Sequence, residues 1–361
     1  YGDLDLTSAF IQKGTSILRF MGGASQDIRP STSAMDFAFN NIESLKSGGT
    51  VTFSNSVNSS TVVGYFTASS TAATVFNFAD VDLTVIGNVS FNENTAVQTS
   101  GGDMYFAGSA TSTATIASTS GYITFGGTFI NNGVLNVGSG RTSFWSDTTS
   151  TPAATINVGT GILDVYDDLD LTSSTLTRGT GLVRFAGGGN SLVHISTNAT
   201  ANNTYFYNMA SLKSGGSVTF TAGSNTSTIL GYFTASSTAA VTYNWGTINM
   251  AVGGNASFNE YATVTSTSGG FRFNGAVSST GAIGTVSGDM LFRSTLQNNG
   301  TLNFGSGSVT TTSALTNAST GTINANTATV NVAASFTNSG TFNKGSSSVR
   351  YTSNSTANVG A

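Results

Sequence analysis

The chain repeats itself at a spacing of about 166 residues, and this spacing constrains its fold more than any other feature of the sequence. Tyr1–Ser8 reads YGDLDLTS, and Tyr166–Ser173 repeats it as YDDLDLTS. Further segments recur at nearly the same offset: SLKSGGTVTF at 44–53 as SLKSGGSVTF at 211–220, GYFTASSTAA unchanged at 64–73 and 231–240, and GNVSFNE at 87–93 as GNASFNE at 254–260. One structural unit therefore occurs at least twice.

A third copy begins near the end of the chain, where KGSSSVRY at 344–351 aligns with KGTSILRF at 13–20 and RGTGLVRF at 178–185. We therefore divide the chain into copy 1 (1–165), copy 2 (166–332) and the start of copy 3 (333–361). Because the chain starts and stops within a repeat, we expect it to be part of a longer repetitive protein or to be capped by neighbouring copies in a filament. The opening residues YGDLDL lack the basic and apolar regions of a signal peptide, so such a peptide would have been removed or lie upstream.

A shorter spacing lies within each copy. The position that ends successive segments, in most cases with an apolar or aromatic residue, recurs about every 20 residues: Phe106, Phe125, Phe144, Val165 and Phe185, then Phe273, Phe292, Thr311, Val332 and Tyr351. Within the segments, apolar residues alternate with Ser, Thr or Asn, which is the pattern of a β-strand with one buried face. Glycine and asparagine cluster between the segments, where turns require a positive φ.

These spacings predict an all-β fold, a parallel β-solenoid (β-helix) of about 20-residue rungs with nearly no helix. One rung cannot bury its apolar face alone, but stacked rungs build a continuous core, with asparagine ladders at the corners. Eight rungs per copy, at the ~4.8 Å spacing of paired strands, predict an advance of roughly 40 Å per copy. The alternative is a tandem array of antiparallel β-sandwiches.

Two stretches resemble a known class of repeat. The runs SFTNSGTFNKGSSSVRY and TLQNNGTLNFGSGSV look like the parallel β-helix repeats of secreted microbial adhesins and surface-layer-like proteins. The resemblance covers Gly121–Asp168 and Gly288–Tyr351 well, and the rest of the chain in composition only. It implies a secreted, rod-shaped protein and identifies no ligand.

The composition narrows the classes of function. Only 8% of the residues are charged, against about 25% in an ordinary soluble domain. The 12 basic residues form no stripe that could follow a phosphate backbone, so we expect no nucleic-acid partner. No apolar run reaches the ~20 residues that span a bilayer. The chain has no cysteine and one histidine, His194, which argues against disulfides, transition-metal sites and catalytic triads.

Acidic residues gather around the junction of copies 1 and 2, at Asp164, Asp167, Asp168 and Asp170, with copy-1 equivalents at Asp3 and Asp5. Because Ca²⁺ takes several oxygen ligands, we predict a cation site at the four residues of the junction, and no other cofactor. The alternatives are the carboxylate pair of a glycoside hydrolase and charges that blunt strand ends.

The two tryptophans occupy different kinds of position in the repeat. Trp245 corresponds to Phe78 one copy earlier, which predicts a core position. Trp145 corresponds to Thr312 one copy later, which predicts a position that is exposed or tolerant of substitution and allows a sugar-stacking role. His194 corresponds to Arg29, so its position does not demand an imidazole.

Several charged residues recur between copies. Lys46 corresponds to Lys213, and Arg19 corresponds to Arg184 and Arg350. We interpret them as solvated surface charge, with pairing to carboxylates across rungs as the functional alternative. A lysine–asparagine isopeptide crosslink at Lys46 or Lys213 is a further alternative.

We therefore predict an extracellular structural protein of the cell surface, not an enzyme, which forms a rigid fibre, stalk or surface layer. Its expected partner is itself, as a head-to-tail or lateral homopolymer. The first alternative is an adhesin or receptor-binding fibre that contacts cell-surface glycans or another cell through the irregular segments Ala24–Gly87 and Gly188–Gly254. A remote alternative is a polysaccharide-active enzyme on a β-helix.

Overall fold

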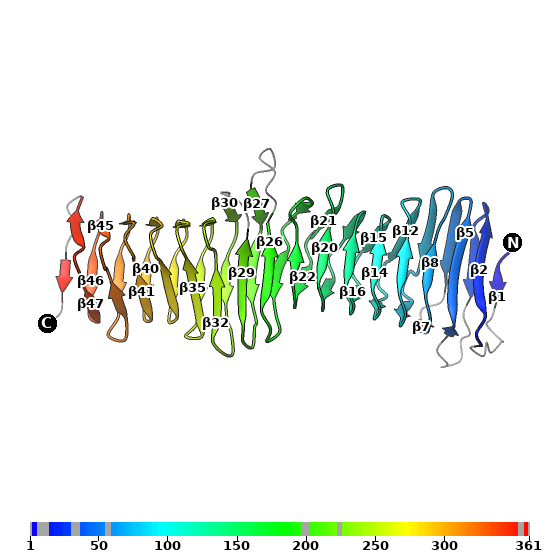
Figure 1. Ribbon diagram of the computed structural model, residues 1–361, viewed down its shortest axis with the longest axis horizontal. Coiled ribbons are helices and arrows are strands. Elements are labelled where there is room, and N and C mark those ends of the chain that lie inside the picture. Colours follow the sequence, from blue (N-terminus) through cyan, green and yellow to red (C-terminus); the bar gives the residue numbers. More distant parts are fainter. Residues whose placement is uncertain are drawn as a thin grey trace. The chain divides into compact units, whose positions relative to one another are not determined.

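The computed structural model describes residues 2–5, 14–29, 37–54, 59–195, 203–221, 226–352 and 357–359. Within these ranges the regular structure is made of β-strands alone, with no helix. The chain forms two compact units, unit 1 at Tyr1–Gly181 and unit 2 at Leu182–Ala361 (Figure 1). The described ranges contain no helix of the length and hydropathy that a membrane span requires.

Unit 1 contains three parallel sheets, A, B and C, and from β2 onward successive strands of the chain join the sheets in rotation. In pairing order, sheet A consists of β1 (Leu4–Asp5), β3 (Gln26–Arg29), β6 (Gly49–Phe53), β9 (Thr74–Asn77), β12 (Thr95–Thr99), β15 (Thr115–Ser118), β18 (Val134–Asn136), β21 (Thr155–Asn157) and β24 (Thr175–Thr177). Sheet B consists of β2 (Ile17–Gly22), β5 (Asn41–Lys46), β8 (Phe66–Ala68), β11 (Val89–Phe91), β14 (Ala110–Ser112), β17 (Phe129–Asn131), β20 (Thr148–Ser150) and β23 (Leu169–Asp170). Sheet C consists of β4 (Phe37–Phe39), β7 (Ser59–Val62), β10 (Asp82–Val85), β13 (Met104–Phe106), β16 (Tyr122–Phe125), β19 (Arg141–Phe144) and β22 (Ile162–Val165).

Unit 2 has the same plan. Its sheets A′, B′ and C′ are named after the sheets of unit 1 whose strands they match in the sequence repeat. Sheet A′ consists of β26 (Ser191–His194), β29 (Ser217–Thr221), β32 (Val241–Asn244), β35 (Ala262–Ser266), β38 (Ala282–Thr285), β41 (Thr301–Asn303), β44 (Thr322–Asn324) and β47 (Thr341–Asn343). Sheet B′ consists of β25 (Leu182–Phe185), β28 (Asn208–Ser211), β31 (Phe233–Ala235), β34 (Ala256–Phe258), β37 (Val277–Ser279), β40 (Leu296–Asn298), β43 (Leu315–Asn317), β46 (Phe336–Asn338) and β49 (Ala357–Val359). Sheet C′ consists of β27 (Asn203–Phe206), β30 (Thr226–Ile229), β33 (Asn249–Val252), β36 (Phe271–Phe273), β39 (Met290–Phe292), β42 (Ser308–Thr311), β45 (Thr329–Val332) and β48 (Ser348–Tyr351).

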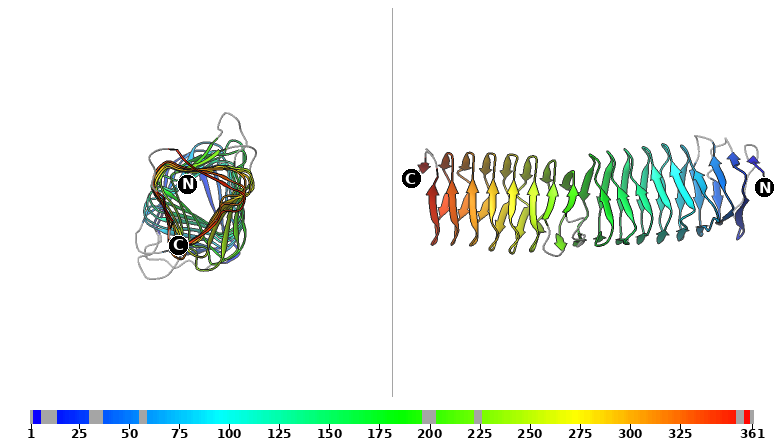
Figure 2. Two further views of the ribbon diagram at one scale, coloured as in Figure 1. Left: turned by 90° about the vertical axis from the view of Figure 1, so that its left-hand side faces the viewer. Right: turned by 90° about the horizontal axis from the view of Figure 1, so that it is seen from above.

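Each turn of the chain thus contributes one strand to each of three sheets, and the next turn stacks on it (Figure 2). This is a parallel β-solenoid, with about 15 turns in the two units together and about 21 residues per turn. The predicted fold class and rung length are confirmed. The alternative of antiparallel β-sandwiches is wrong, because the strands of both units pair in parallel, as between β16 and β19.

The interior of each unit is filled by columns of apolar side chains, one from each turn. Phe106, Phe125 and Phe144 lie in register on β13, β16 and β19. All three are fully buried, and successive ring centroids are 5.3 and 5.7 Å apart. Trp245 is also fully buried and stacks on Phe220 at 3.8 Å, which confirms its predicted core position. The short spacing found in the sequence is therefore the length of one turn.

Asparagine ladders connect successive turns, as predicted. In unit 2 the paired strands β40, β43 and β46 have Asn298, Asn317 and Asn338 as their last residues. Asn298 Nδ2 donates to Asn317 Oδ1 at 2.7 Å, and Asn317 Nδ2 donates to Asn338 Oδ1 at 2.6 Å. Each amide thereby satisfies a buried polar group on the neighbouring turn.

The division into units follows spatial contacts and places the boundary between Gly181 and Leu182. The division into copies follows sequence similarity and places its boundary after residue 165. The two divisions describe different properties, and the copy boundaries remain a sequence-based prediction.

Candidate functional site

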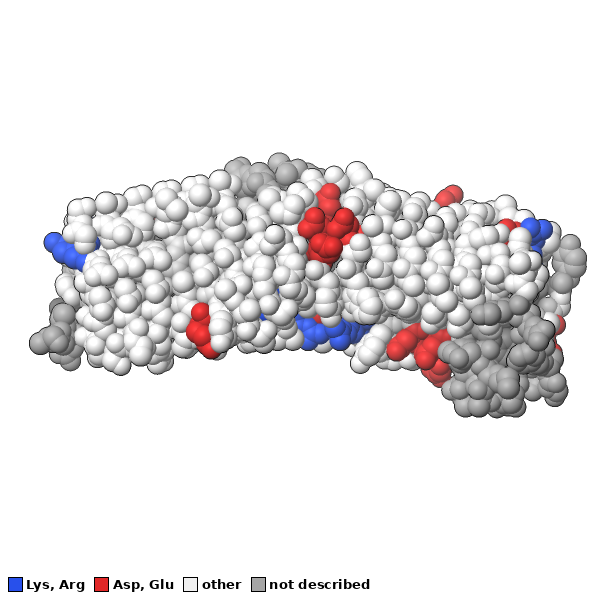
Figure 3. All heavy atoms as spheres, turned by 60° about the horizontal axis from the view of Figure 1, so that its bottom comes forward, with Lys and Arg blue, Asp and Glu red and all other residues white. Residues whose placement is uncertain are grey.

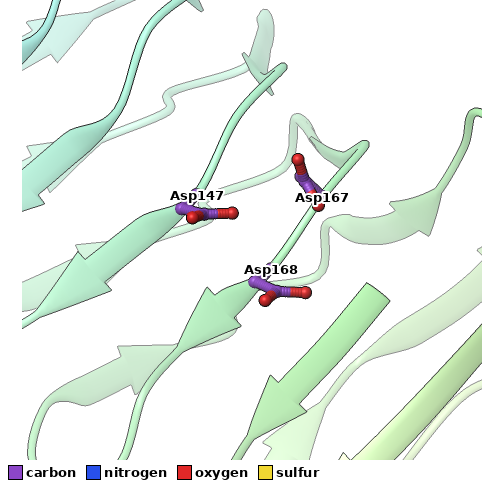
Figure 4. Close-up of side chains that lie close together, drawn as sticks. All are labelled: Asp147, Asp167 and Asp168. Atoms are coloured by element: carbon purple, nitrogen blue, oxygen red, sulfur yellow. The ribbon is translucent and has the colours of Figure 1, made fainter. Parts of the chain in front are cut away.

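Three aspartates form a cluster at one corner of unit 1, where the chain passes from sheet C to sheet B (Figure 4). Asp147 directly precedes β20 and Asp168 directly precedes β23. These strands pair with Thr148 opposite Leu169, so the two aspartates lie one turn apart at the same corner. Together with Asp167, each offers a carboxylate oxygen, and these oxygens lie within 4.8 Å of one another.

This arrangement has the chemistry of a hard-cation site. Ca²⁺ takes six to eight oxygen ligands, so three carboxylates would leave the remaining positions to backbone carbonyls and water. Asp147 is exposed and the other two aspartates are half-buried. In the part of the chain that the structure describes, this is the one group of three or more His, Cys, Asp or Glu side chains with such a geometry.

The structure brings together two of the four aspartates that the sequence analysis selected, Asp167 and Asp168. It adds Asp147, which the sequence analysis missed. The spacing of the rungs could have identified Asp147, because this residue precedes Asp168 by the length of one turn, about 21 residues.

Asp164 and Asp170 take part in other interactions. Asp164 is fully buried and forms an ion pair with Arg141 on the preceding strand of sheet C. Asp170 accepts a hydrogen bond from the backbone N–H of Thr172 at 2.8 Å and a second one from its hydroxyl. Both interactions hold the backbone or a neighbouring side chain in place. Among the copy-1 equivalents, Asp3 accepts a hydrogen bond from the backbone N–H of Asp27 at 2.9 Å.

An aromatic group lies on the outer side of sheet C, next to this corner. It consists of Tyr105 on β13, Trp145 directly after β19 and Tyr166 directly after β22. The ring centroids of Tyr105 and Trp145 are 6.0 Å apart, and those of Trp145 and Tyr166 are 6.3 Å apart. Trp145 is 52% exposed, which confirms the exposed position that the sequence predicted. We call these three residues the aromatic group of unit 1.

Polar contacts hold one side of the aromatic group. Arg141 Nη2 donates to the Tyr166 hydroxyl at 3.1 Å, and Arg141 Nε donates to the buried Asp164 carboxylate. The guanidinium therefore joins Tyr166 to an acid fixed in the protein, which restricts the motion of the tyrosine side chain.

Lys46 and Lys213 are buried at matching positions of the two copies, with no exposed area on either side chain. The interpretation of both as solvated surface charge is wrong. Lys46 Nζ donates to Ala24 O at 2.7 Å and to Gln26 Oε1 at 3.1 Å. Lys213 Nζ donates at 3.3 Å to a backbone carbonyl and to a serine hydroxyl. None of these partners is an asparagine, so these contacts give no support to the isopeptide alternative.

The burial of Lys46 has an electrostatic consequence. Removing an ammonium group from water disfavours its charged form, so burial lowers the pKa of Lys46. The hydrogen bonds from Lys46 Nζ compensate for part of the lost hydration.

Arg19 pairs with a carboxylate across turns, as the sequence analysis suggested. Its Nη2 lies 2.6 Å from Glu43 Oε2, and the Tyr65 hydroxyl donates to Glu43 Oε1 at the same distance. The hydrogen bond from Tyr65 and then the contact with Arg19 lower the pKa of Glu43. This network lies on sheet B and its adjoining turn.

His194 lies at the end of β26 and is half-buried. Its Nδ1 is 2.7 Å from the hydroxyl of Thr221 on the next turn. This contact gives the imidazole a structural role between two turns of unit 2.

Each unit also has a shallow hollow in its surface. In unit 1 a hollow of about 340 Å³ is lined by polar residues of sheet A and its adjoining turns, among them Asp3, Gln26 and Asp27. A hydrogen bond from Ser54 is the main cause of a lowered pKa of Asp27. In unit 2 a hollow of about 290 Å³ lies on sheet C′ beside Arg272 and Asp289.

Comparison with protein-family models, with curated proteins and with solved structures finds no match to this chain.

Proposed function

We propose that this chain is an extracellular structural repeat protein that self-associates into a rigid fibre, stalk or surface layer. The observation that supports this most is the continuity of the core within each unit. Phe125, for example, contacts Phe106 on one side and Phe144 on the other. Further turns can therefore extend such a stack with the same packing and the same backbone hydrogen bonds, whether they come from the same chain or from another copy.

The charge of the chain also favours self-association. Its 12 basic and 16 acidic residues give a net charge of −4 over 361 residues. Charged side chains are sparse on the face shown in Figure 3. Because little like-charge repulsion opposes contact between copies, association requires only modest attractive contacts.

Negative-stain electron microscopy combined with sedimentation velocity tests this proposal. We expect filaments or sheets whose length or area grows with protein concentration, and a matching rise in sedimentation coefficient. A single monomeric species at every concentration, with isolated particles on the grid, would contradict self-association.

An adhesin that contacts glycans is the second candidate function. Its expected contacts are in the irregular segments Ala24–Gly87 and Gly188–Gly254, of which residues 30–36, 55–58, 196–202 and 222–225 lie outside the described residues. The observation that favours this candidate lies elsewhere, in the exposed aromatic group of unit 1. We propose no catalytic function.

A further inference from the structure

Trp145 is an exposed aromatic residue that the packing of the solenoid core does not require. It is 52% exposed on the outer side of a solenoid whose core is already filled by Phe125 and Phe144. The equivalent residue one copy later is Thr312, which also directly follows a strand of the equivalent sheet. The fold therefore accepts a small polar residue at this position, and the indole is not needed for packing.

The whole aromatic group differs between the units while the core beneath it does not. Phe106 and Phe125 correspond to Phe273 and Phe292, which are equally buried. On the outer side, the equivalents of Tyr105, Trp145 and Tyr166 one copy later are Arg272, Thr312 and Ala333. An aromatic cluster confined to one of two matched surfaces indicates a role specific to that surface.

The group is held in place before any ligand binds. Arg141 donates to the Tyr166 hydroxyl and to the buried Asp164, which fixes the tyrosine beside the indole. In unit 2 the positions of Arg141 and Asp164 are occupied by Ser308 and Asn331. A preorganised aromatic surface loses little side-chain entropy on binding, which favours recognition of a small ligand.

The geometry limits the shape of that ligand. Tyr105 and Tyr166 meet the indole at interplanar angles of 56° and 68°. The three rings therefore form no flat strip that could lie on a crystalline polysaccharide. One half-exposed indole with tilted neighbours instead suits a short or single-chain ligand with a flat apolar face, such as a pyranose ring.

The surrounding charge limits the chemistry of the ligand. Asp147 follows Trp145 by two residues, and Asp167 and Asp168 directly follow Tyr166. Without a bound cation, their carboxylates accept hydrogen bonds from hydroxyl or ammonium groups and repel anions. The cation that contacts the group, Arg141, is already paired with the buried Asp164. Uronic acids and sulfated sugars are thereby disfavoured, and neutral or amino sugars are favoured.

A protein partner fits this surface less well. A specific protein interface buries about 800 Å² on each side, with a hydrophobic centre formed by many residues. The aromatic group comprises three residues from the turns that contain β13, β19 and β22. These turns span roughly 14 Å along the stack. This footprint matches a short oligosaccharide.

We propose that the outer face of sheet C in unit 1 is a carbohydrate-binding site for neutral or amino-sugar chains. The indole of Trp145 provides the stacking platform, and Tyr105 and Tyr166 flank it. The proposal does not depend on self-association, since a monomeric chain would present the same surface.

Quenching of tryptophan fluorescence by acrylamide gives a direct test, because Trp145 is half-exposed whereas Trp245 is fully buried. The probes are cellohexaose, maltohexaose and a chitosan hexamer, with a polygalacturonate oligosaccharide as the acidic comparison. We expect at least one neutral or amino-sugar probe to protect the quenchable tryptophan in a saturable manner. Calorimetric titration then gives the affinity for the full chain.

The decisive variant is Trp145→Thr, which installs the residue found at the equivalent position of unit 2. We expect it to keep the circular dichroism spectrum of the parent and to weaken sugar binding by about tenfold or more. Tyr261→Thr, which removes a 43% exposed tyrosine of unit 2, is the matched control and should leave binding unchanged.

Three outcomes would overturn the proposal. The first is that no probe protects the tryptophan or releases heat. The second is binding that Trp145→Thr leaves intact, or that favours the acidic probe. The third is that Trp145→Thr lowers the sedimentation coefficient without any effect of sugars, which would assign the surface to contact with a second copy of the chain.

Discussion

Arg141 and Asp164 form an ion pair between adjacent turns of unit 1 in which the carboxylate is fully buried and the guanidinium side chain is 35% exposed. Arg141 lies opposite Ile162 in the strand pairing, so Asp164 is two residues further along the same outer side. The equivalent positions of unit 2 hold Ser308 and Asn331, and Asn331 Nδ2 donates to Ser308 Oγ at 3.3 Å. The same place in the fold thus carries a charged pair in one unit and a neutral pair in the other.

This relationship predicts strong coupling between the two residues. Arg141→Ser alone removes the cation beside a buried carboxylate and should lower the free energy of unfolding by about 3–5 kcal/mol. The double variant Arg141→Ser/Asp164→Asn copies the pair of unit 2 and should recover most of that loss. Urea denaturation of the parent, both single variants and the double variant measures the coupling energy. Additive effects of the two substitutions would contradict the prediction.

The asparagine ladder of unit 2 should be sensitive to loss of one amide. Asn317 is fully buried, accepts from Asn298, and donates to Asn338 and to the backbone carbonyls of Gly321 and Thr341. Asn317→Ala removes these hydrogen bonds from the ladder, at about 1–3 kcal/mol for each buried group that is left with neither another partner nor water. We expect a clear drop in thermal midpoint by calorimetry. Gln297→Ala, at an exposed position of β40, is the control and should change the midpoint little.

Much of the fold could be predicted from the sequence because a parallel stack repeats its core register at every turn. Phe106, Phe125 and Phe144 recur at a regular spacing in the sequence, and the pairing of their strands places them opposite one another. The number of sheets per turn was not predicted, since such short strands leave too little alternation to separate two strands from three.

The candidate site was only partly predictable. Asp167 and Asp168 were found because they are adjacent in sequence, whereas Asp147 belongs to the preceding turn. The burial of Asp164 could not be predicted, because alternation places this residue on the outer side of β22, where an acid is expected to meet water. Its partner Arg141 comes from another turn, so its burial depends on a contact between turns that local sequence does not reveal.

The buried lysine of copy 1 predicts an unusual pH dependence. Because burial lowers its pKa in the folded state, charged Lys46 costs stability at pH values below that folded pKa. The cost disappears as the pH rises toward the unfolded pKa of about 10.4. Lys46→Met should therefore gain stability relative to the parent at pH 7, and the gain should shrink as the pH approaches 10.

Urea denaturation at a series of pH values measures this difference. Lys213→Met tests the matching buried position of copy 2, and Lys344→Met provides the control at an exposed lysine. A constant difference between Lys46→Met and the parent across the pH range would show that the ammonium does not titrate with a lowered pKa.

Glycine has two roles in this fold, and one of them could be predicted from the sequence. Gly138 adopts a φ of +69°, the turn conformation expected of glycines between the strand segments. Gly140 has no positive φ, but a Cβ there would lie 2.2 Å from the carbonyl oxygen of Gly121 on the preceding turn. Gly140 is required because stacked turns approach closely there, and this requirement cannot be predicted from a local turn pattern.

A pair of alanine substitutions separates this steric requirement from the general effect of replacing glycine. Gly140→Ala forces the turn away from Gly121 and should lower the free energy of unfolding by about 1–3 kcal/mol, the usual cost of overpacking. Gly189→Ala adds a methyl group with no atom within 4 Å, so it should be neutral or should stabilise by a few tenths of a kcal/mol through the unfolded state. Thermal unfolding by circular dichroism measures both. Equal effects of the two substitutions would show that the turns can separate at Gly140 without cost, contrary to the close packing of the stack.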